Sequence, residues 1–279
     1  MVKIAIQGFE GCFHEMAAKQ YFRNNEVKLI YCDTFEQVFH NIEKGDGTMA
    51  LVAIENTIAG SLLHNYELLC NSGATVVGEK KIHISHSICC LPEDSWETIH
   101  EVHSHPVALM QCRKYIESHK QLRAVEAADT AGAAKHIATN KLKGQAAICN
   151  ADAARLFGMK ILEEHIEDNK HNYTRFLVIS PKEKANLVSN QEETNKASLA
   201  FTLSHERGSL SKVLSIFSFY GINLTKIQSL PIIGHEWEYM FYIDLTFDDY
   251  KLYRQSIDAV KPLTREFMNL GEYKDDTTE

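Results

Sequence analysis

The sequence has no long hydrophobic run, and this absence excludes the apolar segments that direct or anchor a chain in a membrane. The N-terminal apolar stretch Val2–Ile6 ends at Gln7 and Gly8, far too early for a signal-peptide core or a membrane span. No longer apolar stretch follows it. We therefore expect a cytoplasmic protein without a membrane partner.

Long basic runs are also absent, and the net charge at pH 7 is −8. A protein that binds nucleic acid needs clustered cations to neutralise phosphates, so we expect no such partner. The negative charge has a second consequence. It repels an anionic substrate, so a site for one must place its hydrogen-bond donors locally.

The seven cysteines show no paired spacing, and an odd number cannot all be bridged within one chain. Cys89 and Cys90 are adjacent, and neighbouring cysteines rarely pair. All seven lie before residue 150, most of them in or beside apolar runs, as small buried hydrophobic residues do. We expect a reduced chain without disulfides.

Motifs for common nucleophiles and cofactors are missing as well. The sequence contains no G-x-S-x-G, no glycine-rich phosphate loop and no zinc-peptidase pattern. His100, His103 and His105 stand close together, but no second His/Cys cluster has the spacing of metal ligands. We expect neither a metal nor another cofactor.

Residues 2–69 alternate apolar runs, turns and helical spacings, an order typical of a parallel α/β layer, and a second set of strands and helices follows up to residue 180. We predict two α/β lobes around a cleft, roughly 1–78 with 165–181, and 79–164. The expected strands are Val2–Gln7, Val27–Tyr31, Met49–Ile54, Thr75–Val77, Ile82–Leu91, Glu101–His103, Leu122–Glu126, Ala146–Cys149 and Ile161–Glu163, and the expected helices are 13–22, 34–44, 62–69, 106–118, 130–138 and 151–157.

A polar stretch without apolar periodicity, 182–196, is predicted to be a linker. Beyond it the order βαββαβ predicts a ferredoxin-like domain at 197–273. The tail, 274–279, is expected to be disordered. The expected strands of this domain are Ala197–Leu203, Ile222–Leu230, Tyr239–Thr246 and Phe267–Leu270, and its expected helices are Leu210–Tyr220 and Tyr250–Val260.

One candidate site lies at 171–180, where a β-branched apolar run follows an amide, a hydroxyl and a guanidinium. These groups belong to Asn172, Thr174 and Arg175. A strand that carries them into a core usually lines a cavity, because a buried polar group without a partner is costly. The alternative is a loop in which Asn172 turns the chain and Arg175 pairs with a surface acid.

Two further candidate sites, 53–61 and 128–132, lie between a strand and a helix. Ligands gather at such strand ends in open α/β sheets, and N–H groups at a helix start favour an anion. In the first, an acid, an amide and a hydroxyl follow the strand; in the second, Thr130 offers a hydroxyl. The alternatives are plain helix caps, by Ser61 and by Asp129.

Together these motifs resemble the prephenate dehydratase family. Ile54–Thr57 with Gly60 and Ser61, and Asn172–Phe176, carry the resemblance, which runs from Val2 to about Ser180. Matching segments also fall at 8–18, 105–106, 111–112 and 129–131.

The segment after the linker resembles an ACT domain, a regulatory module that senses an amino acid. The similar motifs are 208–210 and 228–231. The motif at 228–231 departs from the family pattern, which has a glutamate and an arginine where this chain has Gln228 and Leu230. The Leu230 side chain cannot form an ion pair.

The resemblance implies a two-lobed catalytic domain, 1–181, built like a periplasmic binding protein, and a ferredoxin-like ACT regulatory domain. The implied reaction is the decarboxylative dehydration of prephenate to phenylpyruvate in phenylalanine biosynthesis, a lyase step without a cofactor. The implied control is feedback inhibition by L-phenylalanine. A homodimer or homotetramer is also implied.

The resemblance assigns Thr174 as the hydrogen-bond donor at the departing oxygen, with Asn56 and Asn172 orienting the substrate. For Arg175 two roles stay open, namely a partner for a substrate carboxylate and a brace for Glu55. The full substrate-binding set is Glu55, Thr57, Ser61, Gln111, Thr130, Arg175 and Phe176, and the effector-binding set is Gly208, Ser209, Leu210, Asn223, Leu224, Gln228 and Ser229.

Within the substrate-binding set, Thr57, Ser61 and Thr130 are expected at helix starts, where they would take carboxylates. Packing in the core is favoured for Phe176 over contact with the substrate. Two rival functions remain open. One is an arogenate dehydratase, whose substrate differs by an amino group, and the other is a non-catalytic module that binds a small acid.

Overall fold

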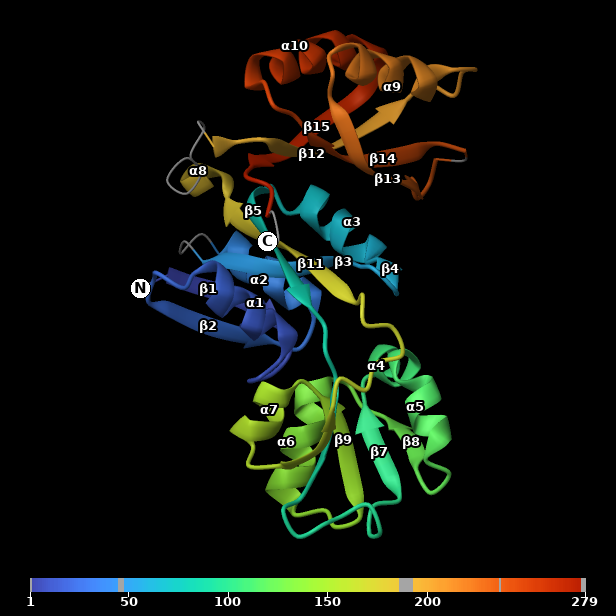
Figure 1. Cartoon of the computed structure of the whole chain (residues 1–279). Coiled ribbons are helices and arrows are strands. Elements are labelled where there is room, and N and C mark those ends of the chain that lie inside the picture. Colours follow the sequence, from blue (N-terminus) through green and yellow to red (C-terminus); the bar gives the residue numbers. More distant parts are fainter. Residues whose placement is uncertain (1, 45–47, 186–192, 236, 277–279) are drawn as a thin grey trace. The chain divides into compact units, whose positions relative to one another are not determined.

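The computed structural model describes residues 2–44, 48–185, 193–235 and 237–276. They form three β-sheets and the helices that flank them (Figure 1). The chain divides into two compact units, which we name unit 1 (Met1–Val38, Leu51–Leu62, Lys81–Phe176) and unit 2 (Phe39–Ala50, Leu63–Lys80, Leu177–Glu279). The domain boundaries expected from the sequence stay predictions.

The first sheet has the strand order β2-β1-β3-β11-β5, and the short β4 pairs with β3. Its strands arise from the apolar runs of the sequence, since β3 is buried along nearly its whole length and β11 is buried over Arg175–Ser180. β1 and β2 run parallel. The strands are β1 (Val2–Gln7), β2 (Val27–Cys32), β3 (Met49–Asn56), β4 (Gly60–Ser61), β5 (Ala74–His83) and β11 (Tyr173–Pro181), and the helices in this part of the chain are α1 (Phe13–Tyr21), α2 (Phe35–Glu43) and α3 (Leu63–Asn71).

The second sheet, with the order β10-β6-β9-β7-β8, lies within unit 1. β7 runs parallel to β8 and β9, whereas β6 runs antiparallel to β9 and β10, so the sheet is mixed. The helix predicted at 106–118 is two helices, because the backbone turns at Cys112. The elements are β6 (Ser87–Cys90), β7 (Glu101–Ser104), α4 (Pro106–Gln111), α5 (Arg113–Ser118), β8 (Arg123–Glu126), α6 (Thr130–Asn140), β9 (Gln145–Cys149), α7 (Ala151–Leu156) and β10 (Lys160–Glu164).

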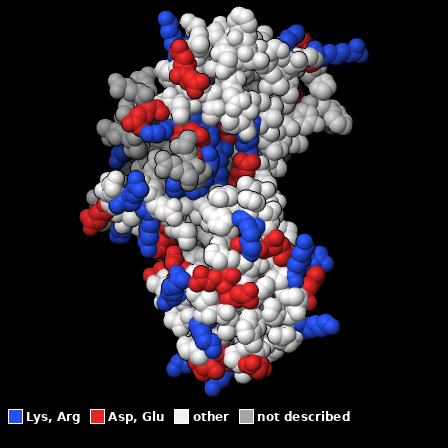
Figure 2. Space-filling view, viewed as in Figure 1, with Lys and Arg blue, Asp and Glu red and all other residues white. Residues whose placement is uncertain are grey.

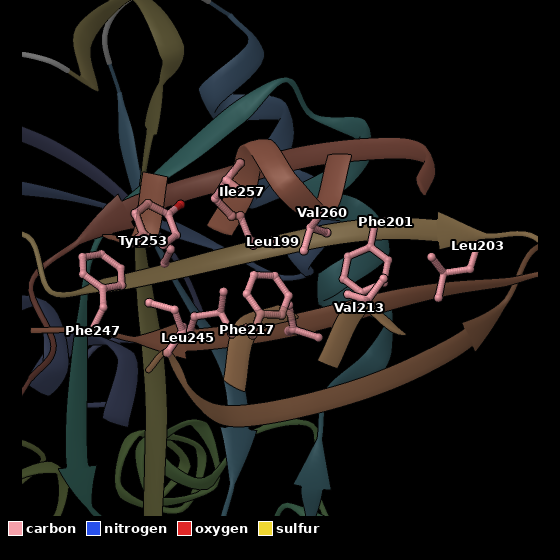
Figure 3. Packing of buried hydrophobic residues seen from close by; sticks show 13 residues of the cluster. Leu199, Phe201, Leu203, Val213, Phe217, Leu245, Phe247, Tyr253, Ile257 and Val260 are labelled. Carbon is pink, nitrogen blue, oxygen red and sulfur yellow. The ribbon is translucent and has the colours of Figure 1, made fainter. Parts of the chain in front are cut away.

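The third sheet, with the order β13-β14-β12-β15, lies within unit 2 and confirms the predicted ferredoxin-like order. Its core is apolar because one face of the sheet meets two helices. Figure 3 shows Phe201 of β12 among Val213 and Phe217 of α9 and Ile257 and Val260 of α10. The elements are β12 (Lys196–Leu203), α9 (Ser209–Phe219), β13 (Asn223–Pro231), β14 (Tyr239–Thr246), α10 (Tyr250–Val260), a 3₁₀ turn (Lys261–Leu263) and β15 (Thr264–Tyr273).

Unit 2 also holds a buried lysine between carboxylates. Lys196 Nζ lies 2.8 Å from Glu79 Oε1 and 2.7 Å from Asp275 Oδ1. The Lys196 side chain is 5% exposed and that of Glu79 is 0% exposed. Asp276 pairs with Lys80 at 3.2 Å, and its backbone N donates to Glu79 Oε1 at 3.1 Å. The residues directly after β15 are therefore held by ion pairs, and the disordered tail predicted from the sequence is wrong for them; 277–279 lie outside the described residues.

The stretch predicted as a linker begins with a short helix, α8 (Lys182–Ala185). Residues 186–192 of that prediction lie outside the described residues. On the face that Figure 2 shows, acidic and basic side chains are interspersed. In the part of the chain that the structure describes, no helix combines the length and the apolarity that crossing a membrane requires.

Candidate active site

Two side chains that stand 118 positions apart in the sequence meet in unit 1. Asn56 ends β3 and Thr174 lies near the start of β11, and Asn56 Nδ2 donates to Thr174 Oγ1 at 3.0 Å. The same amide nitrogen lies 2.8 Å from Asn172 Oδ1 and 3.2 Å from the Tyr173 carbonyl oxygen. Asn56 is 8% exposed and Asn172 is fully buried. The two strand-end motifs thus form one polar cluster.

The backbone fixes the direction of these hydrogen bonds. Asn56 Oδ1 accepts from the backbone N of Ile58 at 3.0 Å and of Ala59 at 2.8 Å, and a backbone N–H can only donate. The Asn56 NH₂ group therefore faces the opposite side, where the Tyr173 carbonyl can only accept. Thr174 Oγ1 accepts from this NH₂ group, so its own proton points elsewhere. Among the described residues, none accepts that proton.

Gln111, the last residue of α4, extends the cluster. Its Nε2 donates to Asn56 Oδ1 at 3.3 Å, and its Oε1 accepts from Asn172 Nδ2 at 3.0 Å. His86 Nε2 lies 2.9 Å from the same Oε1. Gln111 and His86 are 5% and 2% exposed. We call Asn56, His86, Gln111, Asn172 and Thr174 the amide network.

Contacts with residues 167 and 168 hold Gln111 and His86 in place. The Gln111 carbonyl accepts from the Asp168 backbone N at 2.8 Å. The His86 backbone N donates to Glu167 Oε2 at 2.8 Å. The segment before β11 therefore fastens both the end of α4 and the start of β6, which fixes Gln111 and His86 relative to each other.

Burial governs the charge of His86. Desolvation lowers its pKa, although the hydrogen bond to Gln111 and the negative charge of Glu167 act in the opposite direction. The imidazole is therefore neutral. Among the described residues, His86 Nδ1 has no hydrogen-bond partner. Glu167 Oε1 has none either, and Lys170 Nζ lies 3.6 Å from it.

Thr57 contacts backbone and does not stand at a helix start as predicted. Its N donates to the Tyr173 carbonyl at 2.9 Å, and its Oγ1 accepts from the Tyr173 N at 2.9 Å. The hydroxyl in turn donates to the His171 carbonyl at 3.1 Å. Thr57 therefore ties the end of β3 to the start of β11, and its predicted place at a helix start is wrong.

Ser61 is not a helix cap either. The Asn56 side chain accepts from the backbone N–H groups of Ile58 and Ala59, and this turn with Gly60 at φ +85° reverses the chain into a hairpin. Ser61 consequently lies on β4 opposite Glu55. Helix α3 begins only at Leu63. The prediction of Ser61 at a helix start is thereby corrected.

The next two residues of β11 point into the protein. Arg175 Nη1 lies 3.9 Å from Glu55 Oε2, and its side chain is 10% exposed, which agrees with the role of a brace. A role toward a substrate carboxylate stays a prediction. Phe176 is 1% exposed and meets the His14 ring edge-on at 4.9 Å, so it packs in the core as favoured above. Burial lowers the pKa of His14 to about 3.

Thr130 opens α6, and Asp129 caps it. Asp129 Oδ1 accepts from the Gly132 N at 2.7 Å, so the capping alternative is confirmed. Desolvation raises the pKa of the Asp129 carboxyl. Thr130 is 8% exposed, and within the described ranges no hydrogen bond joins it to the amide network. Its contact with a ligand stays a prediction.

The three clustered histidines have separate partners. His103 Nε2 lies 3.1 Å from Glu101 Oε2, and the His105 side chain caps α4 by accepting from the Val107 N. His100 Nδ1 lies 3.4 Å from a carbonyl oxygen of its own loop. In the described part of the chain, no group of three or more His, Cys, Asp or Glu side chains could hold a metal ion.

The predicted effector residues are spread over unit 2. Gly208 is the N-cap of α9 at φ +78°, and Ser209 lines a cavity of about 430 Å³ with Trp237 and Tyr239. Asn223 and Ser229 lie toward opposite ends of β13, about 20 Å apart at the usual strand rise. One copy of the chain therefore does not gather this set in one place. Of the others, Leu210 and Leu224 pack against the core, and Gln228 Nε2 donates to the Ser229 carbonyl.

His86 was not singled out from the sequence. No local pattern marks this residue, because its partner Gln111 lies 25 positions away on another element. The only available signal was that His86 falls between two apolar runs, where a polar side chain must find a partner.

Comparison by sequence gives a family and relatives. A model of the family described as prephenate dehydratase matches residues 4–184. Arogenate dehydratase 1 of Petunia hybrida is 36% identical over 294 residues, which cover 99% of this chain and 68% of that protein. The bifunctional chorismate mutase/prephenate dehydratase of Escherichia coli strain K12 is 29% identical over 274 residues, which cover 97% of this chain and 70% of that protein.

Comparison by structure gives similar folds. A chain described as GqqA, a novel type of quorum quenching acylase, is 28% identical with a TM-score of 0.85, covering 99% of this chain and 98% of that one. The prephenate dehydratase of Staphylococcus aureus is 25% identical with a TM-score of 0.83, covering 98% and 100%. A prephenate dehydratase from Arthrobacter aurescens in complex with L-Phe shares the fold, with a TM-score of 0.87 at 22% identity, covering 98% and 90%.

Proposed function

The chain belongs to the prephenate dehydratase family, and we propose that its amide network catalyses the decarboxylative dehydration of prephenate to phenylpyruvate. In this reaction the bond between the ring and its carboxylate breaks and CO₂ leaves. The released electron pair enters the ring while the C–O bond to the ring hydroxyl breaks. The departing hydroxide takes up one proton and leaves as water, and the new aromatic ring drives the step.

The observation that supports this proposal is the direction of the hydrogen bond between Asn56 and Thr174. Because Thr174 Oγ1 accepts from Asn56, its proton is available to the oxygen that departs. A donor already aimed at the position where negative charge develops stabilises the transition state without reorganisation. An aliphatic hydroxyl is too weak an acid to supply the proton alone, so a water molecule completes the transfer.

The remaining residues orient the substrate. Asn56 and Asn172, both buried, hold the ring hydroxyl beside Thr174. We propose Thr130 and Arg175 as the partners of the substrate carboxylates, since the protein as a whole carries a net charge of −8 and must supply local donors. Glu55 braces Arg175 in this arrangement.

The proposal is tested by incubating the purified protein with prephenate and following the absorbance of phenylpyruvate. We expect saturable turnover at pH 7 that exceeds the rate without protein. Tight binding of prephenate without turnover would contradict the proposal and support the non-catalytic module instead.

Two other substrates belong in the same assay. Arogenate is one, because the Petunia relative at 36% identity is an arogenate dehydratase. An N-acyl amino compound is the other, because a chain of the same fold at 28% identity is described as an acylase. We expect the highest kcat/KM with prephenate. The side chain that hydrogen-bonds to Thr174 Oγ1 is the Asn56 amide, which is not a base that could make this hydroxyl a nucleophile.

We further propose that the ferredoxin-like part of unit 2 is an ACT domain that binds L-phenylalanine and lowers turnover. Its fold and the motifs at 208–210 and 228–231 support this. Because the effector residues do not converge in one copy, the site is completed by a second copy, in a homodimer or homotetramer. β13 lies at the edge of its sheet with Ile227 exposed, which suits such pairing.

The seven free cysteines suit a reducing cytoplasm.

For this sensor we expect L-phenylalanine to inhibit turnover more weakly than in a variant that carries both Gln228→Glu and Leu230→Arg. The restored charges offer the effector an exposed ionic contact, which lowers the half-inhibitory concentration by up to about fivefold. The measurement is a titration of L-phenylalanine against initial rate, with D-phenylalanine as the control. An equal response of both proteins would show that these two positions do not set the sensitivity.

A further inference from the structure

We infer that His86 is a positioning residue of the reaction: its Nε2–H holds the Gln111 amide in the one orientation that leaves the Thr174 proton available to the substrate. The inference rests on the proposed function for its effect on turnover. Its structural part concerns the tautomer of one buried imidazole and stands without any substrate.

Backbone N–H groups fix the donor and acceptor roles in the amide network, because they can only donate. Two backbone N–H groups donate to Asn56 Oδ1, so the Asn56 NH₂ group faces Asn172, which must therefore present Oδ1 there. Asn172 consequently turns its own NH₂ group toward Gln111. Gln111 must then present Oε1 to Asn172 and Nε2 to Asn56 Oδ1, as observed at 3.0 and 3.3 Å.

His86 stands at the end of this chain of amides. Its Nε2 faces Gln111 Oε1 at 2.9 Å, and an oxygen of this kind only accepts, so Nε2 carries the proton. His86 Nδ1 is then a bare acceptor, which fits the absence of any hydrogen-bond partner for it among the described residues. The other tautomer would carry a proton on Nδ1 and leave this buried donor without an acceptor. An unsatisfied buried donor costs the full free energy of its desolvation. The edge-on ring of Phe13, 5.7 Å away, holds the imidazole in place.

Loss of the His86 donor leaves the Gln111 amide held only by its contacts with Asn172 and Asn56, so it rotates by half a turn more readily. Gln111 would then present an NH₂ group to the NH₂ group of Asn172, and one of them must turn away. Either movement disturbs Asn56, whose NH₂ group keeps Thr174 in the role of donor. His86 thus acts on the reacting oxygen only through Gln111. Two further hydrogen bonds connect Gln111 with Thr174, one from Gln111 to Asn56 and one from Asn56 to Thr174.

The test compares two substitutions of one residue. His86→Met fills a similar volume without a donor, and we expect kcat for prephenate to fall by about 10- to 100-fold with KM changed by less than about threefold. His86→Gln places an NH₂ group near the position of Nε2, and we expect kcat within about threefold of the unsubstituted protein. A purely structural role would make the two variants alike, which would overturn the inference.

A double substitution tests the route through Gln111. Gln111→Met already breaks the link, so adding His86→Met should leave kcat within about twofold of Gln111→Met alone. If the two substitutions lowered kcat by independent factors that multiply, His86 would not act through Gln111 and the inference would be wrong. Circular dichroism and thermal unfolding of all variants check that the comparison concerns folded protein.

The tautomer is measured without substrate, so it separates this inference from the proposed function. In protein with ¹⁵N-labelled histidine, NMR should show His86 as the neutral Nε2–H form, and this signal should shift in Gln111→Met. Protonation on Nδ1 would overturn the inference even if prephenate turns over. An Nε2–H signal in a protein that leaves prephenate unchanged would retain the structural part and refute only the proposed reaction.

Discussion

Thr174→Val is expected to lower kcat for prephenate by about 10²- to 10³-fold, the usual effect of removing one preorganised donor at a developing oxyanion. Valine keeps the branched shape that suits a strand, so β11 should keep its place in the sheet. Only the hydroxyl is lost. Its proton is the donor available to the substrate, because Thr174 Oγ1 accepts its hydrogen bond from Asn56. KM should change by less than about threefold, because the contact is made mainly in the transition state. Initial rates over a range of prephenate concentrations give both values.

Thr174→Ser is the matched control. It retains the hydroxyl and the hydrogen bond from Asn56, so kcat should stay within about tenfold of the unsubstituted protein. If Thr174→Val turned over prephenate at a rate close to that of the serine variant, Thr174 would not be the donor and the mechanism proposed above would be wrong.

The largest effect on stability is expected at Lys196. Lys196→Met keeps the length of the side chain but removes the cation that lies between Glu79 and Asp275. The buried Glu79 carboxylate then loses the ammonium that lies 2.8 Å from its Oε1, although the Asp276 N still donates to it. Breaking a buried ion pair on one side lowers the free energy of unfolding by about 3–5 kcal/mol. Urea unfolding followed by circular dichroism measures this change.

Two variants serve as controls for this prediction. Lys80→Met removes the neighbouring, more exposed ion pair with Asp276, and should cost about 1 kcal/mol or less. Lys196→Met combined with Glu79→Met replaces both charges with apolar groups, and should recover most of the lost stability because the buried carboxylate is removed together with its buried cation. Equal losses in the Lys196 and Lys80 variants would mean that burial does not govern the strength of these pairs.

The elements that the sequence predicted well are those whose signal lies within the element itself. β14 and α10 begin and end where their apolar periodicity does, and β1 does so too. The pairing of Asn56 with Thr174 was also predicted, but from the resemblance to a family, since no periodicity connects two strand ends 118 positions apart.

The predictions that failed depend on contacts between distant parts of the chain. Ser61 was expected to cap a helix because its residue type favours that position, yet the Asn56 side chain captures the following N–H groups and makes a hairpin. The helix at 106–118 reads as continuous because nothing in its composition marks the turn at Cys112. His86 went unnoticed because its role is defined only by Gln111.

The capture of two backbone N–H groups by Asn56 also bears on how the protein ages. If the Asn56 amide were hydrolysed to a carboxylate, two oxygens would face the network, and Thr174 would have to donate its proton to one of them. Replacing this one NH₂ group by oxygen would thus remove the Thr174 donor from the reaction and abolish the proposed activity. The backbone nitrogen of Thr57, which would have to attack that amide in spontaneous deamidation, is hydrogen-bonded to the Tyr173 carbonyl and is held away from it. The hydrogen bond that ties the end of β3 to β11 therefore also protects the Asn56 amide from this damage.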